Sequence, residues 1–341
     1  MTFNEIWDEY IQNKKTRVKP STVSAYMTTW YMIKGHFGER EITSLTTKKV
    51  EKWAIDLMDT HSRKTFKDRI VLLNNIMDYY SYEHEVAVNK IQLKYIHWPT
   101  VNAQIDEVDK LKIYSPQEIS EILARIAEDP KPCNLLVAVM IATGIRIGEA
   151  CALTYGNIDF ENGTIEITQT LERISLRSDN YAVADYDRMN TRLLHQAKRS
   201  ALILSTPKCK SSRRAIPLPK ELLKVLKPLS QVYPKDYYIG SHAFKPIEPR
   251  NFRGHYYKLL EQCRFETRHT PHALRHTYAT NLITTGVDVK TTASLLGHGD
   301  TSTTLEIYSH ATPESKKRAM TATIGKQFKK ALPLGMNTNK R

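Results

Sequence analysis

The first 86 residues carry apolar side chains at helical spacing. Val50, Trp53 and Leu57 recur at intervals of three and four, which places them on one face of a helix. Ser21 is a candidate N-cap for another helix, and Gly38 is typical of a residue that ends one. This part of the chain is therefore predicted to form four or five short helices.

Apolar periodicity fades between residues 87 and 114, where Pro99 interrupts a mostly polar stretch, and we expect a linker there. A second domain begins near Ser115. Ser115 and Glu118 have the spacing of a capping box, and Pro116 suits the first helical position. An apolar stripe follows, so a helix is predicted to start at this point.

Short strands are predicted farther along, from alternating apolar residues near 158–160, 164–168, 201–204 and 213–218. Between them, Glu172–Ser200 is rich in Arg, Asp, Asn and Tyr without clear alternation, so we expect an insertion or a long loop. Helical patterns return after Pro219, over residues 221–229, 249–265, 271–284, 288–296 and 303–310.

The predicted fold is mainly α with a small antiparallel β-sheet. It comprises a helical N-terminal domain over residues 1–86, a linker over 87–114, an α+β domain over 115–312 and a tail helix over 313–341. The tail has apolar residues at every fourth position, namely Met320, Ile324, Phe328 and Leu332. A helix at a chain end has to bury such a stripe, either on its own domain or on a neighbouring subunit.

The charge balance favours a polyanionic partner. Fifty Lys and Arg residues against 36 Asp and Glu give a formal charge of +14, which suits nucleic acid, although a basic protein without such a partner stays open on charge alone. The segment 188–214 holds eight Lys or Arg residues and no acidic residue. It is the candidate DNA-facing element.

The four cysteines include no CxxC pair, so the sequence indicates neither a zinc site nor a disulfide framework. This cysteine usage fits a reducing, cytoplasmic location. No uninterrupted apolar run of about 18 residues occurs, which argues against a membrane span or a signal peptide.

The string TGIRIGE contains the first group suited to phosphate chemistry. A buried helix is predicted to break at Gly144 and to restart near Arg146. A guanidinium at that point could donate two parallel hydrogen bonds to a phosphate beside a helix N-terminus. The alternative is that Arg146 merely pairs with Glu149.

The string HALRHTYAT supplies a second group of this kind. Thr270 is a candidate N-cap and Pro271 suits the first turn, so that His272, Arg275 and His276 share one helix face. Two histidines four residues apart could bind a metal, but the neighbouring arginine would repel a cation and the Glu of HExxH is missing. The same face suits a phosphate, and no metal site is expected.

Three further strings place candidate residues at the ends of predicted elements. In LLGHGD, Gly297 is typical of the left-handed residue that ends a helix, and His298 follows at once. In IYSH, Tyr308 falls in the second turn of a helix for which Thr303 is a candidate cap. In TPKCKSSRRAIPLP, a predicted hairpin tip exposes Lys208, whose flexible stem could carry a proton into a groove.

Taken in the order of the sequence, six of these residues resemble the catalytic set of the tyrosine recombinase (phage integrase) family. The set is Arg146, Lys208, His272 with Arg275, His298 and Tyr308. The five strings themselves also resemble those of the family, and they occur in order over 163 residues. The helical N-terminal segment is similar to the family's core-binding, SAM-like domain, so the chain resembles the two-domain type.

The resemblance implies an enzyme that breaks and rejoins DNA. Tyr308 would attack the scissile phosphate, leaving a 3′-phosphotyrosine link and a free 5′-hydroxyl that later attacks in reverse. Bond energy is conserved in this exchange, so neither a metal nor another cofactor is expected. Arg146 and Arg275 would bind the phosphate, on which negative charge accumulates.

The resemblance also implies roles for the remaining residues. Lys208 would protonate the leaving 5′-oxygen, His298 would donate a hydrogen bond to the phosphate, and His272 would accept the proton of Tyr308. Glu149 would support them by holding Arg146 or a histidine. The basic residues beside the hairpin lysine are expected to bind DNA, namely Lys210, Arg213 and Arg214.

The implied partner is double-stranded DNA with a specific recombination site, carried by a mobile element or a chromosome. The family docks its tails on neighbouring subunits, so a homotetramer on DNA is expected, together with possible DNA-bending accessory proteins. Two alternatives remain open. One is a type IB topoisomerase or telomere resolvase with a similar pocket, and the other is a non-catalytic DNA-binding protein of the same fold.

Overall fold

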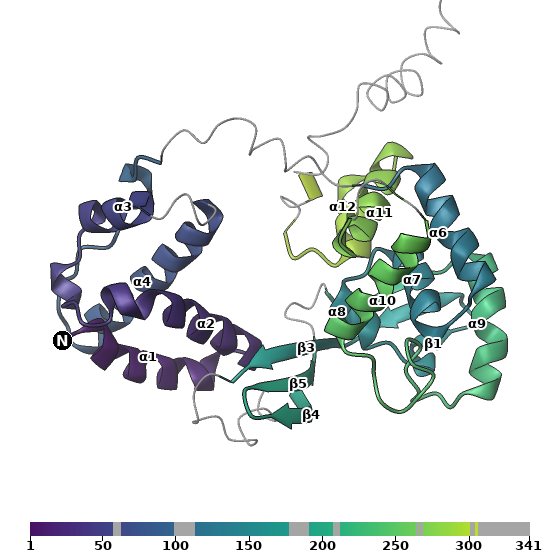
Figure 1. Cartoon of the computed structure of the whole chain (residues 1–341), viewed down its shortest axis with the longest axis horizontal. Helices are drawn as coiled ribbons and strands as arrows, with labels where there is room; N and C mark the ends of the chain where they lie inside the picture. Colours follow the sequence, from purple (N-terminus) through teal and green to yellow (C-terminus); the bar gives the residue numbers. More distant parts are fainter. Residues whose placement is uncertain are drawn as a thin grey trace, which may run out of the picture. The chain divides into compact units, whose positions relative to one another are not determined.

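The computed structural model describes residues 1–56, 63–98, 113–176, 191–206, 212–263, 265, 269–300 and 304–305. The chain divides into two compact units (Figure 1). One contains Met1–Asp109 and Glu172–Ser205, and the other contains Lys110–Leu171 and Thr206–Arg341. The fold is mainly helical with small antiparallel sheets, as predicted.

The N-terminal unit is built from α-helices with short 3₁₀ turns between them. The described helices are α1 (Phe3–Arg17), α2 (Pro20–Phe37), α3 (Thr47–Asp56) and α4 (Arg63–Glu83). The predicted helical unit and the end of α2 at Gly38 are confirmed. The predicted cap at Ser21 is wrong, because α2 already begins at Pro20, whose ring presets the helical φ angle.

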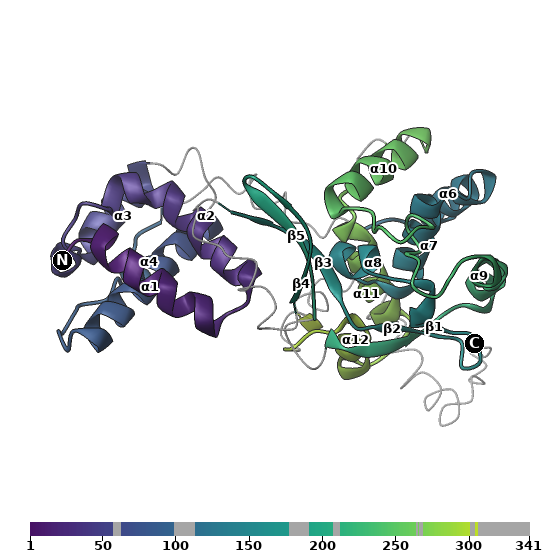
Figure 2. The ribbon, with the colours of Figure 1, turned by 90° about the horizontal axis from the view of Figure 1, so that it is seen from below.

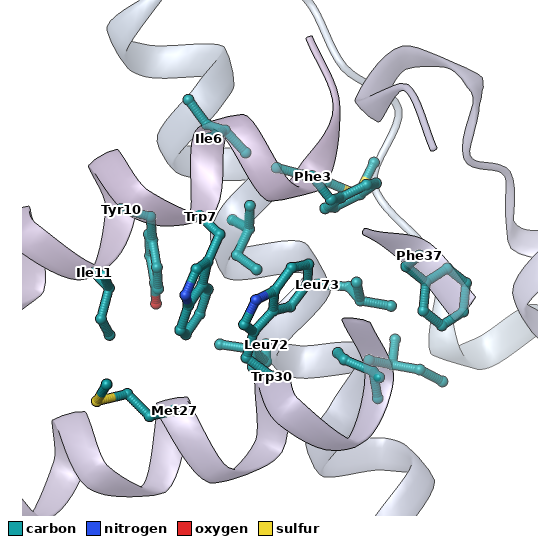
Figure 3. Packing of buried hydrophobic residues seen from close by; sticks show 14 of the residues in the cluster. Phe3, Ile6, Trp7, Tyr10, Ile11, Met27, Trp30, Phe37, Leu72 and Leu73 are labelled. Carbon is teal, nitrogen blue, oxygen red and sulfur yellow. The ribbon is translucent and has the colours of Figure 1, made fainter. Parts of the chain in front are cut away.

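Aromatic side chains fill the centre of this unit. Trp7 of α1 and Trp30 of α2 stack with ring centroids 4.9 Å apart, and Figure 3 shows the two rings face to face beside Leu72 and Leu73 of α4. Phe3 and the other apolar side chains of this core are also buried. These helices are therefore held together by the apolar faces that their sequence spacing predicts.

The segment predicted to be an insertion or long loop contains strands. They are β3 (Thr170–Ser175), β4 (Thr191–Ala197) and β5 (Ser200–Ser205), in the order β3-β5-β4, with β4 and β5 antiparallel. Ile174 and Ile203 join the buried core of the N-terminal helices. Ser24 Oγ accepts a 2.9 Å hydrogen bond from the Ser175 N–H and donates one of 3.1 Å to its carbonyl. The insertion thus packs with the N-terminal unit.

The second unit surrounds helix α7 (Pro132–Thr143), whose apolar side chains point in all directions and are nearly all buried. Helices α6 (Pro116–Glu128), α10 (Pro249–Gln262) and α11 (His272–Thr284) pack against it (Figure 2). The remaining described helices are α8 (Ile147–Cys151), α9 (Lys220–Val232) and α12 (Val289–Leu296). The predicted capping box of Ser115 and Glu118 is confirmed at the start of α6.

A three-stranded antiparallel sheet lies beside these helices. Its strands are β1 (Ile158–Asp159), β2 (Thr164–Ile167) and β6 (Arg214–Pro217), in the order β1-β2-β6. Ile165 pairs with Ile216, and both are buried. Helix α12 packs against β6. The strands predicted near 158–160, 164–168 and 213–218 form this sheet, whereas the strand predicted near 201–204 is β5 of the other sheet. Strands β3 and β4 were not predicted.

Some predictions lie outside the described residues, including the tail helix over 313–341 and the helix over 303–310 beyond Leu305. Among the helices that are described, none is long and apolar enough to cross a bilayer.

Candidate active site

Arg146 lies in a sharp turn between two helices. Helix α7 ends at Gly144 in the left-handed conformation (φ +62°), and α8 begins directly after Arg146. The Arg146 N–H donates to Glu149 Oε2 at 2.9 Å, and its Nη1 donates to Glu149 Oε1 at 3.0 Å. The Arg146 side chain is still 41% exposed. It therefore pairs with Glu149 and also presents unused donors to solvent.

Glu149 is a buried carboxylate held by two arginines. Its side chain is 4% exposed, and Arg214 Nη2 donates to Oε2 at 3.0 Å. Burial raises the pKa of Glu149, but the hydrogen bond and charge of Arg214, followed by those of Arg146, outweigh it and lower the pKa overall. The carboxylate is therefore ionised and acts as the anionic centre of an arginine cluster.

Arg275 of α11 reaches the ends of two other helices. Its Nη1 donates to the Gly144 carbonyl at 2.9 Å, and its Nη2 donates to the Leu296 carbonyl at 2.8 Å. Burial, followed by the charge of Arg146, lowers the pKa of Arg275 to about 9. An anion bound here would offset that repulsion.

His272 and His276 contact each other in the first turns of α11. Their ring centroids are 4.6 Å apart at 88°, and His276 Nδ1 is buried with no hydrogen-bond partner among the described residues. Partial burial, His276 and the charges of Arg275 and Arg146 lower the pKa of His272 to about 4, although the residue keeps access to solvent. His272 is therefore neutral at neutral pH and able to accept a proton.

His272 also borders a cavity of about 300 Å³ at the start of α11. Its lining residues come from the turn before α8, from α10 and from the approach to α11, namely Ile145, Ile147, Arg253, Tyr257, Thr270, Pro271 and His272. The helix begins at His272 with Pro271 in the cap position, and no described side chain caps it. The predicted Thr270 cap is therefore wrong.

His298 follows the left-handed residue Gly297 (φ +68°), which ends α12 as predicted. Its Nδ1 lies 2.8 Å from the hydroxyl of the buried Thr304. Burial and the charges of Arg275 and Arg146 lower the pKa of His298 to about 4. This imidazole is therefore neutral at neutral pH, and among the described residues only its Nδ1 has a hydrogen-bond partner.

The structure thus brings together five residues that the sequence analysis selected: Arg146, Glu149, His272, Arg275 and His298. Lys208, Lys210 and Tyr308 lie outside the described residues. Arg213 is exposed, as a DNA contact requires, whereas the side chain of Arg214 is 6% exposed and bonded inside the protein.

Sequence reasoning missed the internal contacts of Arg214, although a signal was present. Alternate residues of a strand face the same side, so Arg214 belongs with the buried Ile216 rather than with the exposed Arg213. It also missed Thr304, for which the sequence offers no comparable signal.

Comparison with known proteins agrees with this fold. The family described as "Phage integrase family" matches residues 112–315, and "Phage integrase, N-terminal SAM-like domain" matches residues 2–58. The chain therefore belongs to the phage integrase family. It is a tyrosine recombinase, an enzyme that breaks and rejoins DNA.

Two curated relatives illustrate the likeness. The chain is 28% identical to a "Tyrosine recombinase XerC-like" protein of Caldanaerobacter subterraneus subsp. tengcongensis over 76% of its own length, and the match spans 65% of that relative. It is 24% identical to an integrase of Staphylococcus phage L54a over 92% of this chain and 89% of the relative.

Solved structures share the fold. The Tn1549 transposon integrase in complex with transposon right end DNA has a TM-score of 0.68 at 21% identity, covering 94% of this chain and 99% of that one. A lambda integrase dimer bound to a core site has a TM-score of 0.62 at 15% identity, and the match covers 90% of this chain and 95% of that one.

Proposed function

We propose that the chain is the site-specific integrase of a mobile element. In this proposal it cuts and rejoins double-stranded DNA through a 3′-phosphotyrosine bond to Tyr308 and uses neither a metal nor another cofactor. Similarity to the L54a phage integrase and, at 24% identity over 91% of this chain, to the transposase of Tn916 supports the element-borne role. The cytoplasmic location stays a prediction.

The observation that carries the proposal is the convergence of two arginines and two neutral imidazoles on one site. Among the described residues, Arg275 uses two of its five N–H groups on backbone carbonyls, and the other three are available to a phosphate. Arg146 contributes the N–H groups of its guanidinium that are exposed to solvent. Together they would stabilise the charge that builds on the non-bridging oxygens as Tyr308 attacks phosphorus.

Two proton transfers complete the exchange. His272, which its lowered pKa keeps neutral, accepts the proton of Tyr308 as the tyrosine oxygen bonds to phosphorus. Lys208 gives a proton to the 5′-oxygen as the phosphorus–oxygen bond breaks. His298 donates from Nε2 to the phosphate while the Thr304 hydroxyl donates to Nδ1, and Glu149 keeps Arg146 in place.

DNA binding and assembly follow the same reasoning. Lys210 and the exposed Arg213 are the proposed contacts to the DNA backbone, whereas the buried guanidinium of Arg214 favours a role inside the protein. A lambda integrase tetramer bound to a Holliday junction has a TM-score of 0.60 to this chain at 15% identity. We propose a homotetramer on DNA joined through residues 313–341, aided by DNA-bending proteins.

The experiment that tests this proposal maps the bond itself. Protein and DNA carrying the element's ends are denatured after reaction, the protein is digested, and mass spectrometry locates the nucleotide-bearing peptide. The expected result is a nucleotide on Tyr308 and a 5′-hydroxyl on the released strand. A nucleotide on another residue, or a 5′-phosphate end, contradicts the assignment.

A further inference from the structure

Arg214 makes an unusually complete set of internal hydrogen bonds. Its Nε donates to the Leu295 carbonyl at 2.6 Å, Nη1 donates to the Ser212 carbonyl at 3.0 Å, and Nη2 donates to Glu149 Oε2 at 3.0 Å. A guanidinium has its donors in a rigid fork, which an ammonium group cannot imitate. The side chain is 6% exposed, so little of it faces solvent.

These bonds join parts of the site that lie far apart in the sequence. Glu149 belongs to α8 and binds both the backbone and the guanidinium of Arg146. Leu295 lies in the last turn of α12, three residues before His298. Arg214 itself begins β6. The buried side chain of Arg214 therefore connects the turn that carries Arg146 with the turn that carries His298.

Gly297 makes room for this connection. A Cβ placed on Gly297 would lie 2.7 Å from Arg214 Nη1 and 3.0 Å from Cζ. The residue also has φ +68°, a conformation that glycine adopts at little cost. The guanidinium thus packs directly on the backbone of the turn that carries His298.

The charges around Glu149 also support a structural role for Arg214. Arg146, Arg214 and Arg275 surround Glu149, whose carboxylate offsets their repulsion. Removing Arg214 would leave a buried carboxylate with Arg146 as its hydrogen-bond partner and Arg275 as the other nearby cation. Glu149 would then be free to shift, and Arg146 would shift with it.

We propose that Arg214 is a positioning residue for DNA cleavage, which fixes Arg146 and His298 relative to each other without touching DNA. The proposal rests on the proposed function, because it assumes that both residues bind the scissile phosphate. It replaces the DNA-backbone contact that the sequence suggested for Arg214. An error of about 1 Å in such a site can cost about 100-fold in rate.

The test compares Arg214→Met, Arg214→Lys, Glu149→Gln and the double variant Arg214→Met with Glu149→Gln. Lys224→Met, which removes an exposed cation on α9, controls for the loss of one positive charge. For each variant, DNA affinity, single-turnover cleavage at saturating DNA and thermal unfolding are measured. Tyr308→Phe is included to establish that cleavage needs the proposed nucleophile.

The expected result is a change in rate rather than in binding. Arg214→Met should lower the cleavage rate by about 10- to 100-fold with DNA affinity nearly unchanged, because a misplacement of about 1 Å in a catalytic site costs up to about 100-fold. Arg214→Lys should recover part of that rate. Because Arg214 acts through Glu149, the double variant should lose much less than the product of the two single losses.

The opposite results would overturn the proposal. If Arg214→Met weakens DNA binding yet cleaves at the normal rate at saturation, Arg214 is a DNA contact. If the two losses multiply, it does not act through Glu149. Wild type without a covalent adduct would instead contradict the proposed function, whatever Arg214 does.

A second measurement does not depend on cleavage. In Arg214→Met the buried Glu149 keeps Arg146 and Arg275 nearby but loses one of its two ion-pair partners, so its pKa should rise. The drop in melting temperature relative to wild type should therefore be larger at pH 8 than at pH 5.5, where Glu149 takes up a proton. The double variant should show no such difference. A drop in melting temperature that is the same at both pH values in Arg214→Met would contradict the proposed action of Arg214 through Glu149.

Discussion

Arg275 donates a 2.9 Å hydrogen bond to the carbonyl of Gly144, the left-handed residue that ends α7. Its other terminal nitrogen bonds the carbonyl of Leu296 at the end of α12. One guanidinium thus satisfies backbone acceptors of two helix ends and holds them beside Arg146 and His298. The site is therefore assembled by the same side chain that is proposed to bind the phosphate.

This double role predicts a severe effect of Arg275→Lys. A lysine can reach one of the carbonyls but cannot also offer a fork to the phosphate. Single-turnover cleavage should fall by about 100-fold or more at saturating DNA. The melting temperature should also fall, because a buried carbonyl loses its donor. Cleavage near the wild-type rate would remove Arg275 from the proposed chemistry.

Gly297→Ala should be more harmful than alanine at another left-handed glycine. The left-handed conformation alone costs alanine about 1–2 kcal/mol. At Gly297 the new Cβ would also overlap the Arg214 guanidinium, whereas at Gly286 (φ +92°) nothing lies within 4 Å. Thermal unfolding and cleavage of Gly297→Ala and Gly286→Ala test this difference. Equal losses in the two variants would contradict the packing of Arg214 on Gly297.

Acid should destabilise the DNA-free protein through its histidines. The pKa values of His272 and His298 are about 4 in the folded chain, against about 6.5 for an unfolded histidine. Between these values the unfolded state binds more protons, so stability is complete above pH 6.5 and is lost as the pH falls toward 4. In melting curves between pH 7 and pH 5, His298→Gln should lose less stability than wild type. Parallel curves for the two proteins would contradict the lowered pKa of His298.

The insertion should unfold together with the N-terminal helices. Ser24→Ala removes the partner of both the N–H and the carbonyl of Ser175, which should cost about 1–3 kcal/mol. Hydrogen exchange should quicken in β3 as well as in α2. Ser44→Ala, which removes an exposed hydrogen bond to the Glu41 carbonyl, is the control and should have a small effect. Unchanged exchange in β3 would show that the insertion is independent of these helices.

Local signals predicted much of the fold and site. Gly144 and Gly297 end helices in the left-handed conformation, and Ser115 caps α6, because each depends on residues within one helical turn. The order of the motifs then identified Arg146, Arg275 and the two histidines as one set. Lys208, Lys210 and Tyr308 stay predictions.

Long-range contacts account for what was missed. The strands β3 and β4 lie in a polar segment, and their stability depends on pairing with β5 and on packing with the N-terminal helices. The partners of Arg214 lie 65 and 81 residues away along the chain, at Glu149 and Leu295. A string of neighbouring basic residues could not reveal which of them turns inward.

The role of Tyr308 as the nucleophile is tested most directly with DNA that has a nick beside the cleavage position, so that the cut strand diffuses away and the adduct accumulates. Wild type and Tyr308→Phe are compared on a denaturing gel, after both are shown to bind the labelled DNA. A covalent protein–DNA band is expected with wild type and none with Tyr308→Phe. A band with both proteins, or no band from bound wild type, would contradict this role of Tyr308.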